Sequence, residues 1–153
     1  MALSSSAARH VKQALRISRL DHLVITTPDV PKAVAFYRDI LGMTEVDFNG
    51  RKAVCFGKQK INFHPVDNPF EPKALKPTVG SQDLCFIVEQ NVYQVKKYLQ
   101  CALGSDCIEG GQIYNRTGAI NSLRSIYIRD PDDNLIELAN EVDADGRQLA
   151  CYN

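Results

Sequence analysis

The feature that most constrains the fold of this chain is a repeated order of segments: a strand-like stretch, an amphipathic helix and three further short strands. Residues 20–27 alternate polar and apolar side chains, as a half-buried strand does. Asp29 suits the N-cap and Pro31 the first turn of a following helix, which Gly42 ends. The apolar residues of this segment share one helical face: Ala33, Phe36, Tyr37, Ile40 and Leu41.

Three strand candidates follow this helix, at residues 44–48, 52–56 and 60–64. Asn-Gly at positions 49 and 50 is a strong signal for a tight hairpin, so we expect these strands to pair as an antiparallel meander. Residues 65–81 contain four prolines and little periodicity, which predicts a linking loop.

The same order then restarts. Residues 83–88 match the first strand, and Asn91 can cap a helix over residues 92–102. Further strands are expected near residues 107–109 and at 123–128 and 134–140, the last two joined by a tight turn.

These patterns predict an α+β fold in which two tandem βαβββ units form a cupped mixed sheet. The units cover about residues 19–65 and 81–142, so the domain spans 19–142. Residues 1–18 are expected to be a basic N-terminal tail or a mitochondrial presequence, and residues 143–153 a C-terminal tail.

Charge balance and cysteine content narrow the partner and the compartment. Eighteen basic and 18 acidic residues leave no net charge to attract nucleic acid or an acidic membrane, and the apolar runs are too short to span a bilayer. A small-molecule substrate is therefore expected. Five cysteines without a CxxC pair favour a reducing compartment, cytoplasmic or alternatively the mitochondrial matrix, with Cys55 and Cys85 buried.

Ionisable residues occupy strand positions where the pattern otherwise demands apolar ones: His22, His64 and Glu137. Each alone is better explained as a half-exposed residue that hydrogen-bonds or faces water. Buried together they would be costly unless they bound a metal, and these residue types are ligands of divalent cations. The sequence thus predicts a metal centre holding Ni, Zn, Fe or Mn.

Two further groups of polar residues could line the same cup. Ser125, Tyr127 and Arg129 share one face of a predicted strand, from which we expect Tyr127 to enter the cup and Arg129 to face solvent. Residues 114–119 read as a polar loop whose Arg116 could reach an anionic group on a ligand, or as an ordinary surface loop.

Three motifs resemble the vicinal oxygen chelate superfamily, which includes glyoxalase I, fosfomycin-resistance thiol transferases and extradiol dioxygenases: LDHLVI at 20–25, AFYRDILG at 35–42 and IYIRDPDDNLIE at 126–137. The similarity covers about residues 19–142 in order. Within the superfamily, the group called glyoxalase domain-containing protein 5 also resembles this chain at FGKQKINFH (56–64) and FEPKA (70–74).

The resemblance implies a metal held by the first and last strands of each unit, at positions His22, Asn62, Asp83 and Glu137. Glyoxalase I usually has a carboxylate where Asn62 stands and a histidine where Asp83 stands. His64 is two residues from Asn62 and hence on the same strand face, which makes it a substitute ligand. The expected metal ligands are His22, His64, Asp83 and Glu137, and the expected substrate contacts are Asn62, Arg116, Ser125 and Tyr127.

The resemblance also implies a metal-dependent reaction of the lyase or isomerase type on a small oxygenated or thiol-conjugated metabolite, glutathione conjugates included, with Glu137 moving a proton. Alternatives are a non-catalytic small-molecule-binding module and an extradiol-type dioxygenase using His22, His64 and Glu137 around iron. Relatives are commonly homodimers, so a homodimer is expected, with the cup formed within one chain or across two.

Overall fold

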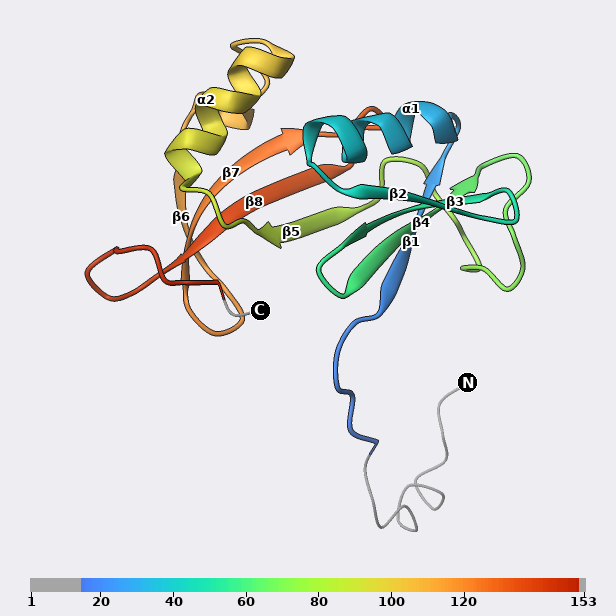
Figure 1. The fold of residues 1–153 in the computed structure, drawn as a ribbon, viewed down its shortest axis with the longest axis horizontal. Coiled ribbons are helices and arrows are strands. Elements are labelled where there is room, and N and C mark those ends of the chain that lie inside the picture. The colour runs from blue at the N-terminus through green and yellow to red at the C-terminus, as the bar shows by residue number, and fades with distance from the viewer. Residues whose placement is uncertain (1–14, 152–153) are drawn as a thin grey trace.

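The computed structural model describes residues 15–151 and contains two successive βαβββ units (Figure 1). In the first unit, β1 (His22–Thr27) leads into α1 (Val30–Ala35) and the π-helix η2 (Phe36–Ile40). Strands β2 (Thr44–Phe48), β3 (Arg51–Phe56) and β4 (Gln59–Pro65) follow.

The second unit repeats this order after a loop over residues 66–82. It comprises β5 (Asp83–Ile87), α2 (Val92–Leu103), the 3₁₀ turn η3 (Glu109–Gly111), β6 (Tyr114–Thr117), β7 (Ser122–Arg129) and β8 (Leu135–Val142). The predicted α+β fold of two tandem units is confirmed.

Each unit forms its own four-stranded mixed sheet, and the two sheets have the same order. The orders are β1-β4-β3-β2 and β5-β8-β7-β6. The first and last strands of each unit run parallel, whereas the other neighbours are antiparallel. Strands β1 and β5 are therefore edge strands, each with one side unpaired in its sheet.

The first helical segment begins and ends as its sequence predicts, but its second half is a π-helix instead of an α-helix. The Asp29 side chain accepts a hydrogen bond from the Lys32 amide at 3.0 Å, and Pro31 lies in the first turn. The Leu41 amide bonds the Phe36 carbonyl five residues earlier, which makes the second half a π-helix. Gly42 then adopts φ +71°, the left-handed conformation that glycine favours.

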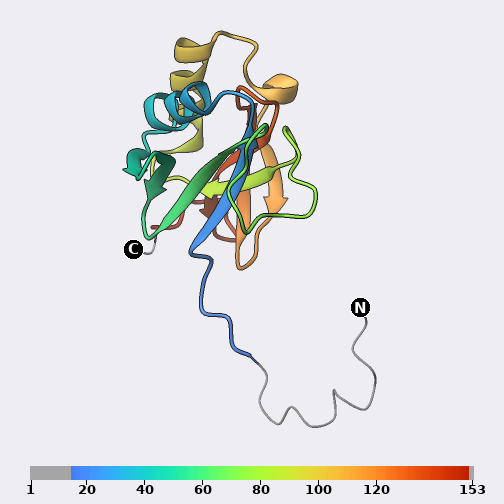
Figure 2. The same cartoon turned by 90° about the vertical axis from the view of Figure 1, so that its right-hand side faces the viewer.

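A single hydrophobic core joins the two units. Both helices lie on the same side of the sheets (Figures 1 and 2), and the buried cluster draws on both units, including Ile25 and Phe63 from the first and Ile126 and Ile136 from the second. The face of each sheet turned away from this core is called the outer face below.

Buried hydrogen bonds also connect the units and hold the second helix. The Tyr37 hydroxyl donates to Asp130 Oδ2, across 93 positions of sequence, at 2.9 Å. Asn140, 2% exposed, accepts from the Val92 amide at 2.7 Å and donates to the Val88 and Gln90 carbonyls at 2.9 Å each. This side chain therefore fixes the start of α2 against β8.

One predicted strand was wrong. Residues 107–109 lead into η3, with Gly110 at φ +64° and Gly111 at φ +67°, and the outer strand of the second sheet is β6, where a polar loop was expected. Because β6 is an exposed edge strand, three of its four residues face solvent and it lacks the apolar alternation that reveals buried strands.

The prediction that Cys55 and Cys85 are buried was wrong for Cys85. Cys55 is half-buried, but Cys85 is exposed on the outer face of β5. Within residues 15–151, none of the helices is long and apolar enough to cross a membrane. The prediction of a basic tail or presequence falls largely on residues outside the described range.

Candidate functional site

The outer face of the first sheet carries three of the predicted site residues. Because side chains alternate along a strand, His22 on β1 and Asn62 and His64 on β4 point away from the buried Ile61 and Phe63. The register places Val24 beside Asn62 and Thr26 beside His64.

His22 presents an oriented imidazole at the start of β1. Its Nδ1 lies 2.9 Å from Asp21 Oδ1, and nearly half of the side chain is exposed. Asp21 is itself bonded by Arg19 at 3.1 Å. A carboxylate on Nδ1 fixes the ring and leaves Nε2 available, the arrangement that supports a metal-binding histidine.

His64 lies in a more enclosed position, against the loop that links the units. Its ring contacts Phe70 edge-to-face at 5.2 Å between centroids, and a small cavity of about 100 Å³ lies beside it, lined also by Val24 and Thr26. Partial burial, with a smaller contribution from the charge of Arg51, lowers the pKa of His64 below its ordinary value. The neutral ring is thereby favoured.

The outer face of the second sheet carries the remaining predicted ligands. Asp83 begins β5 and Glu137 lies in the middle of β8, directly beside Cys85. Since Val24 pairs with Asn62 in the first unit as Cys85 pairs with Glu137 in the second, Asn62 and Glu137 occupy equivalent positions. By the same register, His22 is equivalent to Asp83.

Glu137 is an incompletely hydrogen-bonded side chain of this face. Its Oε1 is buried and has no hydrogen-bond partner within the described chain. Although Cys85 is exposed as a whole residue, partial burial of its thiol and then the adjacent Glu137 charge raise the pKa of that thiol to about 12, which keeps it protonated. A buried carboxylate oxygen without a partner is costly unless something outside the chain binds it.

The polar residues around Glu137 form a continuous patch. Tyr127 is its cross-strand partner on β7, and Arg116 Nε donates to the Tyr127 hydroxyl at 2.9 Å. Ser125 lies two residues from Tyr127 on the same face, is fully buried and also has an unpartnered Oγ. We call Arg116, Ser125, Tyr127 and Glu137, with Tyr114, the Glu137 patch.

The structure brings some predicted residues together and keeps others apart. Arg116, Ser125, Tyr127 and Glu137 are assembled on the second sheet, whereas His22, Asn62 and His64 are on the first. Among residues 15–151, no three His, Cys, Asp or Glu side chains are grouped so that they could hold a metal ion. One chain thus offers donors of suitable chemistry but does not converge them.

Two residues of this region were missed by the sequence reasoning. Cys85 touches Glu137 because the parallel register of β5 and β8 places them side by side. Tyr114 packs on Tyr127, with 5.7 Å between ring centroids, because β6 pairs with β7. Recognising β6 as a strand would have revealed Tyr114, because Tyr114 and Arg116 are two residues apart and therefore lie on the same face of that strand.

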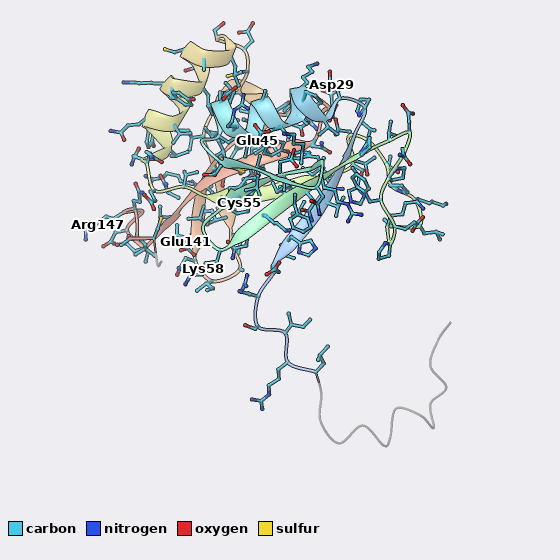
Figure 3. The ribbon with its side chains drawn as sticks, turned by 45° about the vertical axis from the view of Figure 1, so that its right-hand side comes forward. Asp29, Glu45, Cys55, Lys58, Glu141 and Arg147 are labelled. Carbon is cyan, nitrogen blue, oxygen red and sulfur yellow. The ribbon has the colours of Figure 1, made fainter. Side chains whose placement is uncertain are left out.

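A larger cleft of about 1020 Å³ lies between the units, at the end of the molecule where Figure 3 labels Lys58 and Glu141. Its walls are mainly apolar, and its charged lining residues are Asp39, Glu89 and Glu141. None of the predicted site residues borders this cleft, but Cys85, which touches Glu137, does. The cleft therefore adjoins the Glu137 patch without including its residues.

Comparison with known proteins agrees with this architecture. The model of the glyoxalase/bleomycin resistance protein/dioxygenase superfamily matches residues 19–92. Glyoxalase domain-containing protein RDO1 of Mycosarcoma maydis is 49% identical over 134 residues, 87% of this chain and 74% of that protein. The chain belongs to this superfamily.

Solved structures share this fold. Virulence protein STM3117 of Salmonella typhimurium is 46% identical over 87% of this chain and 91% of its own length, and its crystal structure matches with a TM-score of 0.79 over 84% of this chain and all of that one. Lactoylglutathione lyase from Agrobacterium tumefaciens, 21% identical, has a TM-score of 0.61 over 81% of this chain and 94% of that one, which shows a shared fold alone.

Proposed function

We propose that this superfamily member is a divalent-metal-dependent enzyme of the lyase or isomerase type that acts on a small oxygenated or thiol-conjugated metabolite. The observation that carries this proposal is the buried, unpartnered Oε1 of Glu137 at the centre of an outer sheet face. A bound cation would compensate this oxygen, and the oriented His22 is a donor of matching chemistry.

The proposal includes a second copy of the chain. One chain separates His22 and His64 from Glu137 on two sheets, and β1 and β5 each leave one edge unpaired. Apolar side chains also remain exposed on these edge strands, with Val24 at 38% and Ile87 at 44%. A homodimer that sets the first sheet of one chain against the second sheet of its partner would cover these residues and unite the donors.

Each residue then has a defined task. A divalent cation held by His22 and Glu137, with His64 or Asp83, would supply Lewis-acid polarisation of two adjacent substrate oxygens. Glu137 takes a proton from one substrate carbon and returns it to the neighbouring carbon, as a general base and then a general acid. The Cys85 thiol, protonated at neutral pH, adds no competing charge beside it.

Elemental analysis of the purified protein tests this proposal. We expect a stoichiometric divalent metal in the wild type that is lost in both His22→Ala and Glu137→Gln. Glu141→Gln is the matched control, because Glu141 lies on the same strand but already accepts a hydrogen bond from Asn121 at 3.1 Å. Retention of metal in the Glu137→Gln variant would remove this carboxylate from the site.

Mixing the two variants tests the shared site. If His22 of one chain and Glu137 of its partner bind one metal, refolding equimolar His22→Ala and Glu137→Gln together should restore about one quarter of the wild-type metal content. Half of the dimers are then mixed, and each mixed dimer has one intact site. No recovery in verified mixed dimers would show that the two residues do not share a site across chains.

The alternative is a non-catalytic binding module in which the outer faces hold a small molecule without metal. The absence of three converging donors within residues 15–151 favours it. A dimeric protein that stays metal-free after incubation with Ni, Zn, Fe and Mn would support this alternative over the enzyme.

A further inference from the structure

Arg116 is a cation held in a fixed place without an acidic partner. Its guanidinium carbon lies 4.6 Å from the centroid of the Tyr114 ring and 5.4 Å from that of Tyr127. None of the ion pairs found among residues 15–151 includes Arg116, although Arg129 on the neighbouring strand is paired with Glu109 at 2.9 Å. Two aromatic rings therefore replace the usual carboxylate as its support.

The free donors of Arg116 lie on the outer edge of its guanidinium. Nε donates to the Tyr127 hydroxyl at 2.9 Å and Nη1 donates to the Asn115 carbonyl at 3.3 Å. A guanidinium has five N–H donors, so Nη2 and one hydrogen of Nη1 remain. Such a pair of donors matches the two oxygens of a carboxylate or phosphate.

A second observation on the same face also points to a ligand. Ser125 Oγ and Glu137 Oε1 are buried without hydrogen-bond partners, and both adjoin Tyr127. Ser125 is in addition the direct cross-strand partner of Tyr114. Three groups of different chemistry, a cationic edge, a hydroxyl and a carboxylate, thus surround one tyrosine.

The arrangement limits the size of that ligand. Arg116 is on β6 and Glu137 on β8, with only β7 between them. By register Arg116 lies opposite Leu123, and Leu123 lies opposite Glu141, so Glu137 is two strand spacings across and four residues along from Arg116, about 16 Å at the backbone. The Arg116 side chain spans much of this distance, because its Nε reaches the hydroxyl of Tyr127, the cross-strand partner of Glu137. A molecule bound by Arg116 at one end therefore reaches Glu137 with only a few atoms between.

We propose that the ligand of the Glu137 patch is a small molecule with a carboxylate, bound by the outer edge of Arg116 on the Tyr114 and Tyr127 rings. Ser125 bonds a neutral oxygen of the same ligand. This proposal rests on the proposed function, because the ligand's other end is the part that Glu137 would deprotonate. Arg116 is a substrate-binding residue that fixes which end of the molecule faces Glu137.

The test measures ligand binding and not turnover, so it does not depend on the metal. We would titrate the chelator-treated full-length protein with two- to six-carbon mono- and dicarboxylates, the matching amides and inorganic phosphate, following binding by calorimetry and backbone amide NMR shifts. We expect at least one carboxylate to bind, its amide to bind far more weakly, and the shifts to centre on residues 114–127.

Variants then assign the contact. Arg116→Gln should weaken carboxylate binding about tenfold or more, whereas Arg116→Lys should retain part of it because lysine keeps the charge but loses the paired donors. Arg129→Gln, on the same outer face, is the matched control and should bind as the wild type does. All of these proteins should retain wild-type metal content if the metal proposal is correct, which separates the two readouts.

Three results would overturn the proposal: no carboxylate binds, binding is unchanged in Arg116→Gln, or only inorganic phosphate binds. In the last case the same edge would recognise a phosphate ester and the carboxylate assignment would be wrong. A wild-type protein that binds no metal but binds the carboxylate through Arg116 would refute the metal proposal and leave this inference standing.

Discussion

Replacing Tyr37 with phenylalanine isolates one buried hydrogen bond between the two units. The Tyr37 hydroxyl donates to Asp130 Oδ2 at 2.9 Å, and both residues are nearly fully buried. The phenylalanine ring would keep its contacts with Phe36 and Phe63, whose centroids each lie 5.5 Å away. The substitution therefore removes the bond with little loss of packing.

The expected cost follows from what Asp130 retains. Its carboxylate still accepts from the Asp132 and Asn134 amides at 2.9 Å each and from Asn134 Nδ2 at 2.8 Å. A hydrogen bond to a charged group contributes about 1.5–3 kcal/mol, so Tyr37→Phe should lower the free energy of unfolding by about 2 kcal/mol. For a chain of this length that corresponds to a drop of about 4–8 °C in Tm.

Urea denaturation followed by circular dichroism measures this free energy. Tyr93→Phe is the matched control, because Tyr93 is 52% exposed on α2 and its hydroxyl makes no hydrogen bond among the described residues. It should change the free energy of unfolding by no more than about 0.5 kcal/mol. Equal unfolding midpoints for Tyr37→Phe and the wild type would refute the argument that this bond ties the units together.

Three further predictions concern single side chains. Asn140→Ala should lower the free energy of unfolding by about 3 kcal/mol, because it leaves the Val92 amide and two carbonyls unpaired; a urea midpoint close to that of the wild type would contradict this. The pKa of His64 is lowered in the folded protein, so as the pH falls the unfolded chain binds a proton at this residue first, and the protein loses stability. His64→Gln should therefore reduce the loss of unfolding free energy between about pH 7.5 and 5; identical curves of stability against pH for the variant and the wild type would argue against it. Gly110→Ala should displace the Tyr114 side chain, which its Cβ would meet at φ +64°, and so weaken carboxylate binding by Arg116; unchanged titrations would show that the ring support is dispensable.

Much of the fold could be predicted because its signals are local. Asp29, Pro31 and Gly42 mark the limits of the first helical segment, and Asn49 and Gly50, both at positive φ, form the predicted hairpin turn. The π-turn within that segment has no local sequence signal, and it lies where Tyr37 hydrogen-bonds Asp130 and packs on Phe63.

The site could be predicted strand by strand but not as an assembly. The family resemblance matched Asn62 to Glu137, and the strand registers place these two residues at equivalent positions. Alternation alone assigns Asn62 and His64 to the same face and does not choose between them. It does not determine which faces meet. The inner faces of the two sheets and the helices share one hydrophobic core. His22 and Glu137 lie on the outer faces of different sheets, so within one chain they do not form a metal-type cluster.

The shared core has a consequence for how the chain could be divided. The loop over residues 66–82 exposes Leu75 at 95%, so a cut there would break little packing. Each fragment would expose the apolar face that its counterpart normally covers, and the bond between Tyr37 and Asp130 would guide their docking. Two separately expressed fragments of this protein should therefore reassemble without a covalent link, so that recovery of the folded state shows that the two fragments have bound each other.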